Sequence, residues 1–261
     1  MADNVAQHFR PSEAAFLDVA QGLIRQALDE YRPVLTNFLN PRQRYIIETL
    51  VNQHDDLKWQ HEGGYADAES ARTVIAPAYY DIQQSDFELA VIAINYPQKF
   101  AELHHSTILG TLMNNGITRD SIGDIISGEE GTWHFLTTVP MATYIQTTMD
   151  HIGKTKVRFE TASLTDISAP IEEWTEIDTT VSSLRLDTLV ANGYNVSRTH
   201  AKELVERGQV RVNWTDVDRP DFVLAVNDLV SVRHFGRLKL VAENGMTKKD
   251  KWRVSLAVMK K

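Results

Sequence analysis

The spacing of apolar residues predicts that the chain begins with helices. Over residues 12–32, apolar side chains recur every three to four positions, as in an amphipathic helix, and Pro33 ends the run. A second helix is expected to start after Asn40, a good helix cap that is followed directly by proline. A short strand, a Gly-Gly turn at 63–64, a short helix and another strand should follow. Residues 1–80 are therefore expected to form a helical N-terminal domain.

The pattern changes near Asp86, where short apolar runs typical of strands begin. The expected order is strand, helix, strand, strand, helix, strand, which is the ferredoxin-like or RRM-like unit. We place this middle domain at residues 81–165. Trp133 and Phe135 lie on a strand where RRM proteins carry aromatic residues that stack on bases. The segment is acidic and lacks the RRM signature, so we expect both side chains in the core.

The C-terminal part is expected to be a compact domain of helices and strands. Residues 166–181, acidic and without periodicity, are predicted to be a linker, although a connector containing a strand is also possible. Residues 182–261 begin with a short apolar helix that should end at Gly193. The overall class is therefore α+β, with three small domains.

The second helix of this domain carries two cations on one face. Ser197 is a typical N-cap, and Gly208 is expected to end the helix. Arg198 and Lys202 are four residues apart, a spacing that is unfavourable for like charges, and a cation in the first turn opposes the helix dipole. A phosphate bound at this N-terminus would offset the cost of placing Arg198 there.

Alternating residues follow this helix. Val210 and Val212 are expected to point inward, with Arg211 and Asn213 pointing outward. Further strands are expected in the segments 229–233, 237–241 and 252–260.

The distribution of charge separates the ends of the chain. The net charge is −8, yet residues 182–261 contain 15 Lys and Arg against 9 Asp and Glu, a net charge of +6. Residues 1–181 therefore carry −14. This asymmetry is typical of a basic binding domain on an acidic body, although chance clustering would also produce it.

Composition narrows the protein class. Cysteine is absent, so disulfides and thiolate metal sites are excluded. We find neither an apolar run long enough to span a membrane nor a signal peptide, which predicts a cytoplasmic protein. No glycine-rich nucleotide loop or metal-ligand spacing occurs, so we expect no cofactor, no metal and no small-molecule substrate.

The C-terminal domain resembles the S-four RNA-binding domain, also called the alpha-L motif. The resemblance rests on Arg185-Leu186-Asp187, Ser197-Arg198, Ala201, the segment 208–213 (GQVRVN) and the segment 228–233 (DLVSVR), in that order. Two glycines of the family pattern are replaced. Asn227 is a mild change, because asparagine tolerates a positive φ. Trp214 puts the usual turn in doubt, and its ring would either pack on the protein or stack on a base.

The whole chain resembles the bacterial YlmH family. The segments that carry this resemblance are LNPRQRYIIETLVNQHD, INYPQKFAELHHSTILGTLM, VSSLRLDTLVA, QVRVNW and TKKDKWRV. The resemblance implies an RNA-binding factor with no known catalytic centre, associated with the large ribosomal subunit and its tRNA in the rescue of stalled translation. It also implies a link to cell division. RNA and the ribosome are the expected partners, and we expect a monomer.

The candidate RNA-binding residues lie in the C-terminal domain. Arginine suits phosphate because its guanidinium donates two parallel hydrogen bonds. Lysines in a run are more often a solvated surface, which leaves the last three residues open to either interpretation. The candidates are Arg185, Ser197, Arg198, Lys202, Arg211, Asn213, Arg233, Arg237, Lys239, Lys248, Lys249 and Lys251.

Two alternative functions remain. The first is an RNA-modifying enzyme, a pseudouridine synthase or methyltransferase, that uses the S-four domain as its RNA handle. The second is a protein-interaction scaffold linked to cell division, whose acidic body binds a partner.

Overall fold

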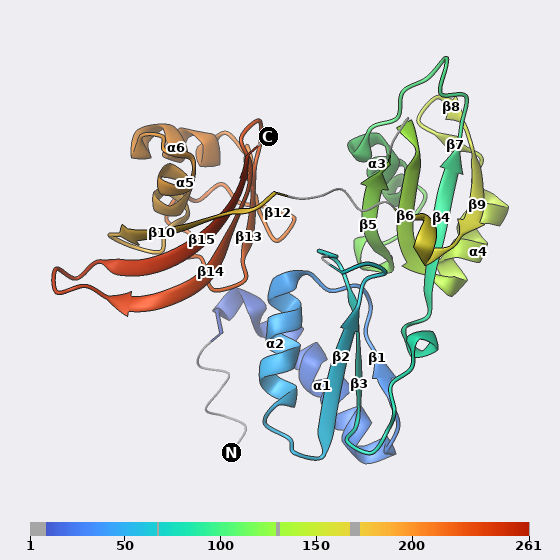
Figure 1. Cartoon of the computed structure of the whole chain (residues 1–261), viewed down its shortest axis with the longest axis horizontal. Coiled ribbons are helices and arrows are strands. Elements are labelled where there is room, and N and C mark those ends of the chain that lie inside the picture. Colours follow the sequence, from blue (N-terminus) through green and yellow to red (C-terminus); the bar gives the residue numbers. More distant parts are fainter. Residues whose placement is uncertain (1–8, 67, 129–130, 168–172, 261) are drawn as a thin grey trace. The chain divides into compact units, whose positions relative to one another are not determined.

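The protein consists of two compact units. The structure is a computed structural model that describes residues 9–66, 68–128, 131–167 and 173–260, and its two units comprise residues 1–170 and 171–261 (Figure 1). The domain boundaries expected at residues 80, 165 and 181 stay a prediction. Among the described residues, no helix has the length and apolarity needed to cross a membrane.

The N-terminal part of the first unit packs two helices on a small antiparallel sheet. Its elements are α1 (Ala14–Glu30), β1 (Val34–Leu35), α2 (Pro41–Val51), β2 (Leu57–Glu62) and β3 (Arg72–Pro77), with strand order β1-β3-β2. The two predicted helices are confirmed. The side chain of Asn40 caps α2 by accepting a hydrogen bond of 2.8 Å from the N–H of Gln43.

The prediction of a short helix between β2 and β3 was wrong. The described residues there, 63–66 and 68–71, form no helix. A tertiary contact explains the difference. The backbone N–H groups of Glu69 and Ser70 donate to the buried carboxylate of Asp124 at 2.8 and 3.1 Å. These donors are therefore unavailable to a local helix.

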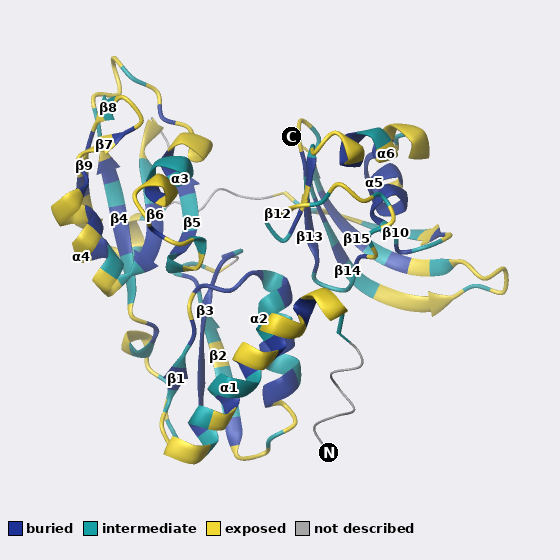
Figure 2. Ribbon diagram, turned by 180° about the vertical axis from the view of Figure 1, so that it is seen from behind, coloured by how far each residue is buried: buried dark blue, intermediate teal, exposed yellow. Residues whose placement is uncertain are grey.

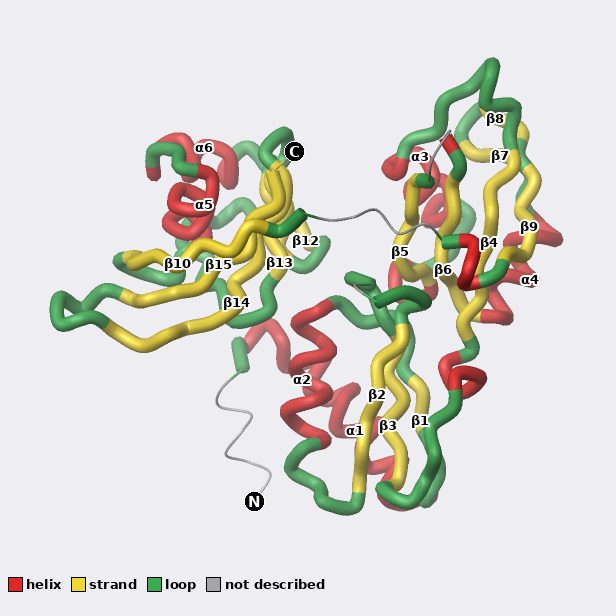
Figure 3. Tube along the Cα trace, in the orientation of Figure 1, coloured by secondary structure: helices red, strands yellow, loops and turns green. Residues whose placement is uncertain are grey.

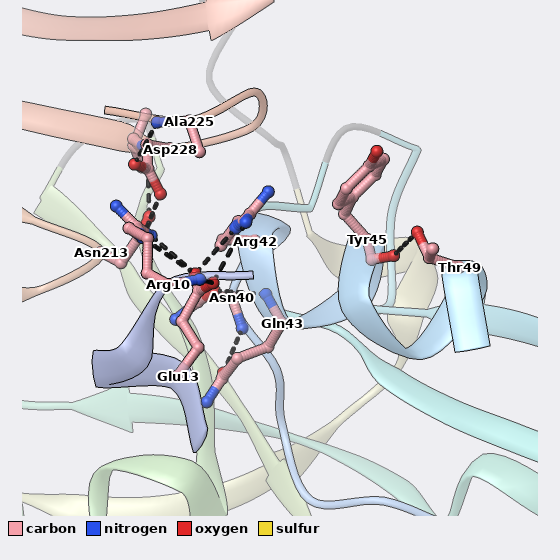
Figure 4. A network of polar contacts seen from close by, with 11 residues as sticks. Arg10, Glu13, Asn40, Arg42, Gln43, Tyr45, Thr49, Asn213, Ala225 and Asp228 are labelled. Carbon is pink, nitrogen blue, oxygen red and sulfur yellow. Dashed lines mark hydrogen bonds and ion pairs between the residues drawn. The ribbon is translucent and has the colours of Figure 1, made fainter. Parts of the chain in front are cut away.

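A buried ion cluster fixes the start of α1. Glu13 accepts hydrogen bonds from the Nε of Arg42 at 2.9 Å and from the Nη2 of Arg10 at 2.7 Å (Figure 4). Burial alone would raise the pKa of the Glu13 carboxyl, but the two guanidinium groups outweigh this effect and lower its pKa to about 2. The carboxylate thus stabilises the fold while it is ionised.

The middle part of the first unit has the predicted strand and helix order. Its elements are β4 (Leu89–Asn95), α3 (His105–Asn114), β5 (Ile122–Ser127), β6 (Trp133–Thr138), α4 (Val139–Thr148) and β9 (Arg158–Ala162), with a small additional hairpin of β7 (His151–Ile152) and β8 (Thr155–Lys156). The antiparallel sheet has the order β5-β6-β4-β9, as in ferredoxin-like folds. The predicted ferredoxin-like unit is confirmed.

The two faces of this sheet are covered by different parts of the chain. Helices α3 and α4 cover one face, where Phe135 is fully buried and Trp133 packs against the same core, as expected. On the other face, Val91 and Leu136 form a cluster with Phe38 and Tyr65, which come from the N-terminal part. Much of the surface that an RRM would offer to bases is therefore occupied.

The second unit is a six-stranded antiparallel sheet with two helices on one face (Figure 3). Its elements are β10 (Thr175–Val181), α5 (Leu186–Tyr194), α6 (Arg198–Glu206), β11 (Val210–Val212), β12 (Thr215–Asp216), β13 (Leu229–Val232), β14 (Gly236–Met246) and β15 (Trp252–Lys260). The strand order is β10-β15-β14-β13-β11-β12.

The segment expected as a linker, residues 166–181, contains a strand. β10 pairs with β15 over seven residues, from Thr175 opposite Val258 to Val181 opposite Trp252. Its inward residues Ile177 and Val181 join the core of the second unit, while acidic residues alternate with them. The high charge of the segment concealed this alternation. Residues 168–172 lie outside the described residues.

Helix α5 continues through Gly193, where the sequence predicted its end. The helix ends at Tyr194, and Asn195 takes the left-handed conformation at φ 53°. Gly193 is needed for packing, because a Cβ at this position would lie 2.1 Å from Cδ1 of the buried Leu238. The glycine thus lets α5 approach β14 closely.

We expect Glu13→Gln to lower the free energy of unfolding of the first unit by roughly 2–3 kcal/mol at neutral pH, since it leaves two arginines facing a neutral group. The pKa of Glu13 is lower in the folded state, so the stabilisation is complete above pH 4.5 and is lost as the pH falls towards about 2. Urea denaturation across pH measures this. Glu30→Gln, at an exposed pair with Arg32, is the control. Equal losses in the two variants would contradict the prediction.

We expect Gly193→Ala to destabilise the second unit by about 1–3 kcal/mol, because the added methyl group overpacks the contact with Leu238. Gly22→Ala is the matched control. Gly22 also lies inside a helix, but a Cβ there meets nothing within 4 Å, so alanine should stabilise by about 0.5–1 kcal/mol. Thermal unfolding distinguishes the two signs. Stabilisation by both variants would exclude the packing explanation.

Candidate nucleic-acid interface

A buried carboxylate holds two of the predicted arginines together. The side chain of Asp187 is 3% exposed and lies in the first turn of α5. The Nε of Arg185 donates to its Oδ1 at 3.1 Å, and the Nε of Arg198 donates to its Oδ2 at 3.1 Å. The arginine side chains remain 37% and 53% exposed. The carboxylate thus positions two cations at the surface.

Electrostatics favour the ionised form of this carboxylate. Burial alone would raise the pKa of Asp187, but the hydrogen bonds from Arg185 and Arg198 hold its pKa below its ordinary value. The hydrogen bond between Arg185 and Asp187 in turn raises the pKa of the Arg185 guanidinium. The three side chains together carry a net charge of +1. Arg185 also interacts with the charge of Asp221.

The backbone around α5 fixes the position of Asp187. The N–H groups of Leu186 and Asp187 donate to the carbonyls of Phe222 and Pro220, at 2.7 and 3.1 Å. Arg185 pairs with Val223 in an isolated bridge of the same segment. The first donors of α5 are therefore satisfied by the protein, which leaves the start of α6 as the better place for an anion.

The start of α6 is built as the sequence predicts. The Ser197 side chain accepts a hydrogen bond of 3.1 Å from the N–H of His200, which confirms the cap. Gly208 follows the helix at φ 65°. The carboxylate of Asp187 balances the charge of Arg198 in the first turn, so a bound phosphate is not required to explain that residue. The guanidinium of Arg198 donates only its Nε to Asp187, and its other donors extend the positive surface.

Two other predicted cations form exposed ion pairs. Lys202 lies 3.6 Å from Glu206 on α6, as expected from their spacing. Arg211 lies 2.7 Å from Asp216 across the β11–β12 turn. Exposed pairs of this kind contribute about 0–1 kcal/mol, so a phosphate can exchange for the carboxylate at small cost.

The predicted cations do not share one face of the domain. Leu238 and Leu240 pack in the core beneath the helices, so Arg237 and Lys239 alternate onto the outer face of the sheet. Arg211 belongs to the same face, because Ser231 pairs with both Arg211 and Arg237. The candidate residues of the segment 197–214 are therefore divided between two faces, since α6 and the side chain of Arg211 lie on opposite faces of the sheet.

The remaining cations lie in turns. Arg233 is exposed in the turn between β13 and β14. Lys248, Lys249 and Lys251 are exposed at the tip of the β14–β15 hairpin, whose outer part is largely exposed (Figure 2). The Thr247 hydroxyl orders this tip by accepting from the N–H groups of Lys249 and Lys251.

The side chain of Asn213 stabilises the turn that follows β11. It lies beyond the end of β11, so the inward and outward alternation does not extend to it. Its side-chain amide donates to Asp228 at 2.7 Å, and its oxygen accepts from the N–H of Leu229 at 3.0 Å (Figure 4). Asp228 is fully buried and also accepts from the N–H of Ala225. The pair ties the β11–β12 turn to the start of β13.

The turn expected after β11 forms despite the replacement of glycine. Asn213 and Trp214 both adopt positive φ, at 48° and 68°, which is the geometry of a tight two-residue hairpin turn. Trp214 is partly buried. Asn227, which replaces the other glycine, lies at φ 68° as expected.

Asp187 is not among the predicted site residues; the sequence indicates it as part of the motif and as an alternative ion-pair partner of Arg185, a pair that the structure contains. A signal was available. Arg185 and Asp187 are separated by one apolar residue at a helix start, so a buried Leu186 places both polar side chains beside the helix N-terminus.

Three family models match the chain. The YlmH N-terminal model matches residues 14–80, the model of the YlmH RNA-binding domain matches residues 83–166, and the S4 domain model matches residues 184–230.

Similar proteins are found among curated and solved proteins. The chain is 37% identical over 252 residues to ribosome-associated protein quality control protein P2 of Bacillus subtilis, with 97% of each chain covered. It is 42% identical over 66 residues to small ribosomal subunit protein uS4A of Clostridium perfringens, covering 23% of this chain and 32% of that protein. The solved structure of cell division protein ylmH from Streptococcus pneumoniae is 31% identical, with a TM-score of 0.54, and the match covers 61% of this chain and 96% of that chain.

We expect Asp187→Asn to lower the free energy of unfolding of the second unit by about 1–3 kcal/mol, because the amide cannot balance two guanidinium groups. The pKa of Asp187 is lower in the folded state, so its stabilisation is present above the ordinary aspartate pKa and is lost as the pH falls through the folded value. Denaturant unfolding at several pH values measures both effects. Asp216→Asn, which breaks the exposed pair with Arg211, should change stability by less than about 0.5 kcal/mol.

Proposed function

Since the chain belongs to the YlmH family, we propose that it is an RNA-binding factor without catalytic activity of its own that acts on the ribosome. It binds ribosomal RNA of the large subunit and tRNA held there, and it acts in the quality control of stalled translation. It works in the cytoplasm as a monomer. The name of the Bacillus subtilis relative, a ribosome-associated quality control protein, supports this role.

The observation that carries the proposal is the pair of arginines held by Asp187. A guanidinium whose Nε is fixed by a buried carboxylate keeps its remaining N–H donors in a defined orientation. Less conformational entropy is then lost when a phosphate binds. The start of α6 adds the positive end of a helix dipole beside Arg198. Together these features favour a phosphate group of a nucleic acid, which accepts directed hydrogen bonds, over an anion attracted by net charge alone.

The candidate residues contribute unequally. Arg198 is the principal phosphate contact, because its side chain is the more exposed and it lies at the start of α6, and Arg185 is second. Lys202 extends the same surface along α6, and Ser197 acts as the helix cap. Asn213 is assigned to the stability of the turn.

The other cations form further electrostatic contacts outside the α5–α6 surface. They lie on the outer face of the sheet, in the turn after β13 and at the hairpin tip. This group comprises Arg211, Arg233, Arg237, Lys239, Lys248, Lys249 and Lys251.

We expect Arg198→Ala to weaken binding to purified large ribosomal subunits and to tRNA by about 1–3 kcal/mol, roughly five- to 150-fold, because one phosphate contact is lost. The slope of affinity against salt concentration should fall by about one unit. Fluorescence anisotropy at several salt concentrations measures both quantities.

Arg207→Ala is the matched control. It removes the same charge from the end of the same helix, where Arg207 pairs with Glu203 and Asp187 is not involved. We expect its effect to stay below about 0.5 kcal/mol. If both variants weakened binding equally, the contribution would come from net charge alone. If neither changed it, RNA binding would not use the α5–α6 surface.

A further inference from the structure

The first unit contains a cavity that the interface above does not use. It has a volume of about 430 Å³, within the range of small-ligand pockets. Its lining includes the end of β2, the loop that follows it, Arg44 of α2, and Leu164. The loop passes very close to the ferredoxin-like sheet, since a Cβ on Gly64 would lie 2.1 Å from Cδ2 of Leu136. The cavity is thus a feature of how the two parts of this unit pack.

Arg44 places a guanidinium at this cavity. Its Nη2 donates to the carbonyls of Ala68 and Glu69, at 3.3 and 3.1 Å, which fixes the plane of the guanidinium. Its Nε is covered by the protein and has no partner among the described residues. A ligand in the cavity would therefore meet the guanidinium through its terminal Nη groups, whose N–H bonds are donors.

Glu62 supplies a hydrogen-bond acceptor, its carboxylate, at the same cavity. Its Oε1 accepts a hydrogen bond of 2.6 Å from the N–H of Gly64, which holds the carboxylate at the loop. His61 adds no charge at neutral pH, because burial and the neighbouring Arg44 lower its pKa to about 4. Among the described residues, one cation and one carboxylate line the cavity, so their charge does not favour an anion such as phosphate.

The remaining lining is mixed. His61 and Tyr65 offer rings, Ala68, Ala71 and Leu164 offer apolar surface, and Gln84 adds an amide that can donate or accept. A ligand that fits has an uncharged planar or apolar body, with hydrogen-bond acceptors on one edge and donors on another. A nucleobase has this chemistry.

Guanine matches the two polar groups. Its O6 and N7 accept from a guanidinium, and its N1–H and N2–H₂ groups donate to a carboxylate. Adenine, cytosine and uracil do not offer both pairs. We propose that this cavity binds one unpaired guanine of an RNA, with Arg44 and Glu62 reading its two edges. The inference rests on the proposed function as an RNA-binding factor and adds base recognition in the first unit.

The test uses the full-length chain labelled with ¹⁵N. Guanosine, adenosine, cytidine and uridine monophosphates and inorganic phosphate are titrated separately, at up to about 10 mM to cover dissociation constants near 1 mM. We expect guanosine monophosphate to give saturable shifts of the Gly63 and Gly64 amide signals, with at least tenfold higher affinity than the other nucleotides. No saturable shift with any nucleotide, or equal shifts with inorganic phosphate alone, would overturn the proposal.

Two variants sharpen the test. Glu62→Gln keeps an oxygen for the Gly64 N–H but loses the carboxylate, so guanosine monophosphate should bind at least tenfold more weakly. Ala66→Leu places bulk at an exposed position of the lining and should weaken all binding at the cavity. Glu30→Gln, at an exposed acid of the same unit, is the control and should change nothing. If guanosine monophosphate bound the Glu62→Gln and Ala66→Leu variants as tightly as the unchanged protein, the assignment of the cavity as its binding site would be contradicted.

The nucleotide titration and the test of the proposed function can fail independently of each other. Mononucleotide binding at the cavity does not involve Arg198, and the ribosome and tRNA measurements report on the α5–α6 surface. A failed titration with an intact effect of Arg198→Ala would remove only the cavity assignment. The reverse result would remove the phosphate contact and keep the base pocket.

Discussion

The carboxylate of Asp187 is the interaction on which the candidate interface depends. Two arginines from separate helices would repel each other at the α5–α6 corner, and a charge in the first turn of α6 would oppose the helix dipole. One buried anion offsets both effects and still leaves the guanidinium groups partly exposed. The motif that joins Arg185, Asp187 and Arg198 is therefore best understood as one unit. Its acidic member is as necessary as its basic members.

Local signals in the sequence predicted most elements, because each depends on residues close in the chain. The caps at Asn40 and Ser197 and the alternation of Val210 and Val212 are examples, and the structure confirms them. The ferredoxin-like strand order also follows from the order of short apolar runs. In each of these cases, local periodicity and tertiary packing favour the same conformation.

The wrong predictions share a different physical cause. The loop after β2 is not helical because Asp124, more than fifty residues away, takes its backbone donors. Gly193 lies inside helix α5, and a glycine is needed there because a Cβ would collide with Leu238. A long-range contact decides both cases, and the sequence contains no local sign of it.

Under the proposed function, the two units would divide RNA recognition between charge and shape. The first unit, residues 1–170, contains 12 Lys and Arg against 22 Asp and Glu, a net charge of −10, which disfavours nonspecific contact with a polyanion. Phe38 and Tyr65 also occupy much of the sheet face that an RRM would use. A contact between RNA and this unit must therefore gain its free energy from a few directed hydrogen bonds and from apolar burial. A cavity lined by a guanidinium and a carboxylate meets that requirement, whereas the basic residues of 182–261 would supply the attraction that depends on salt.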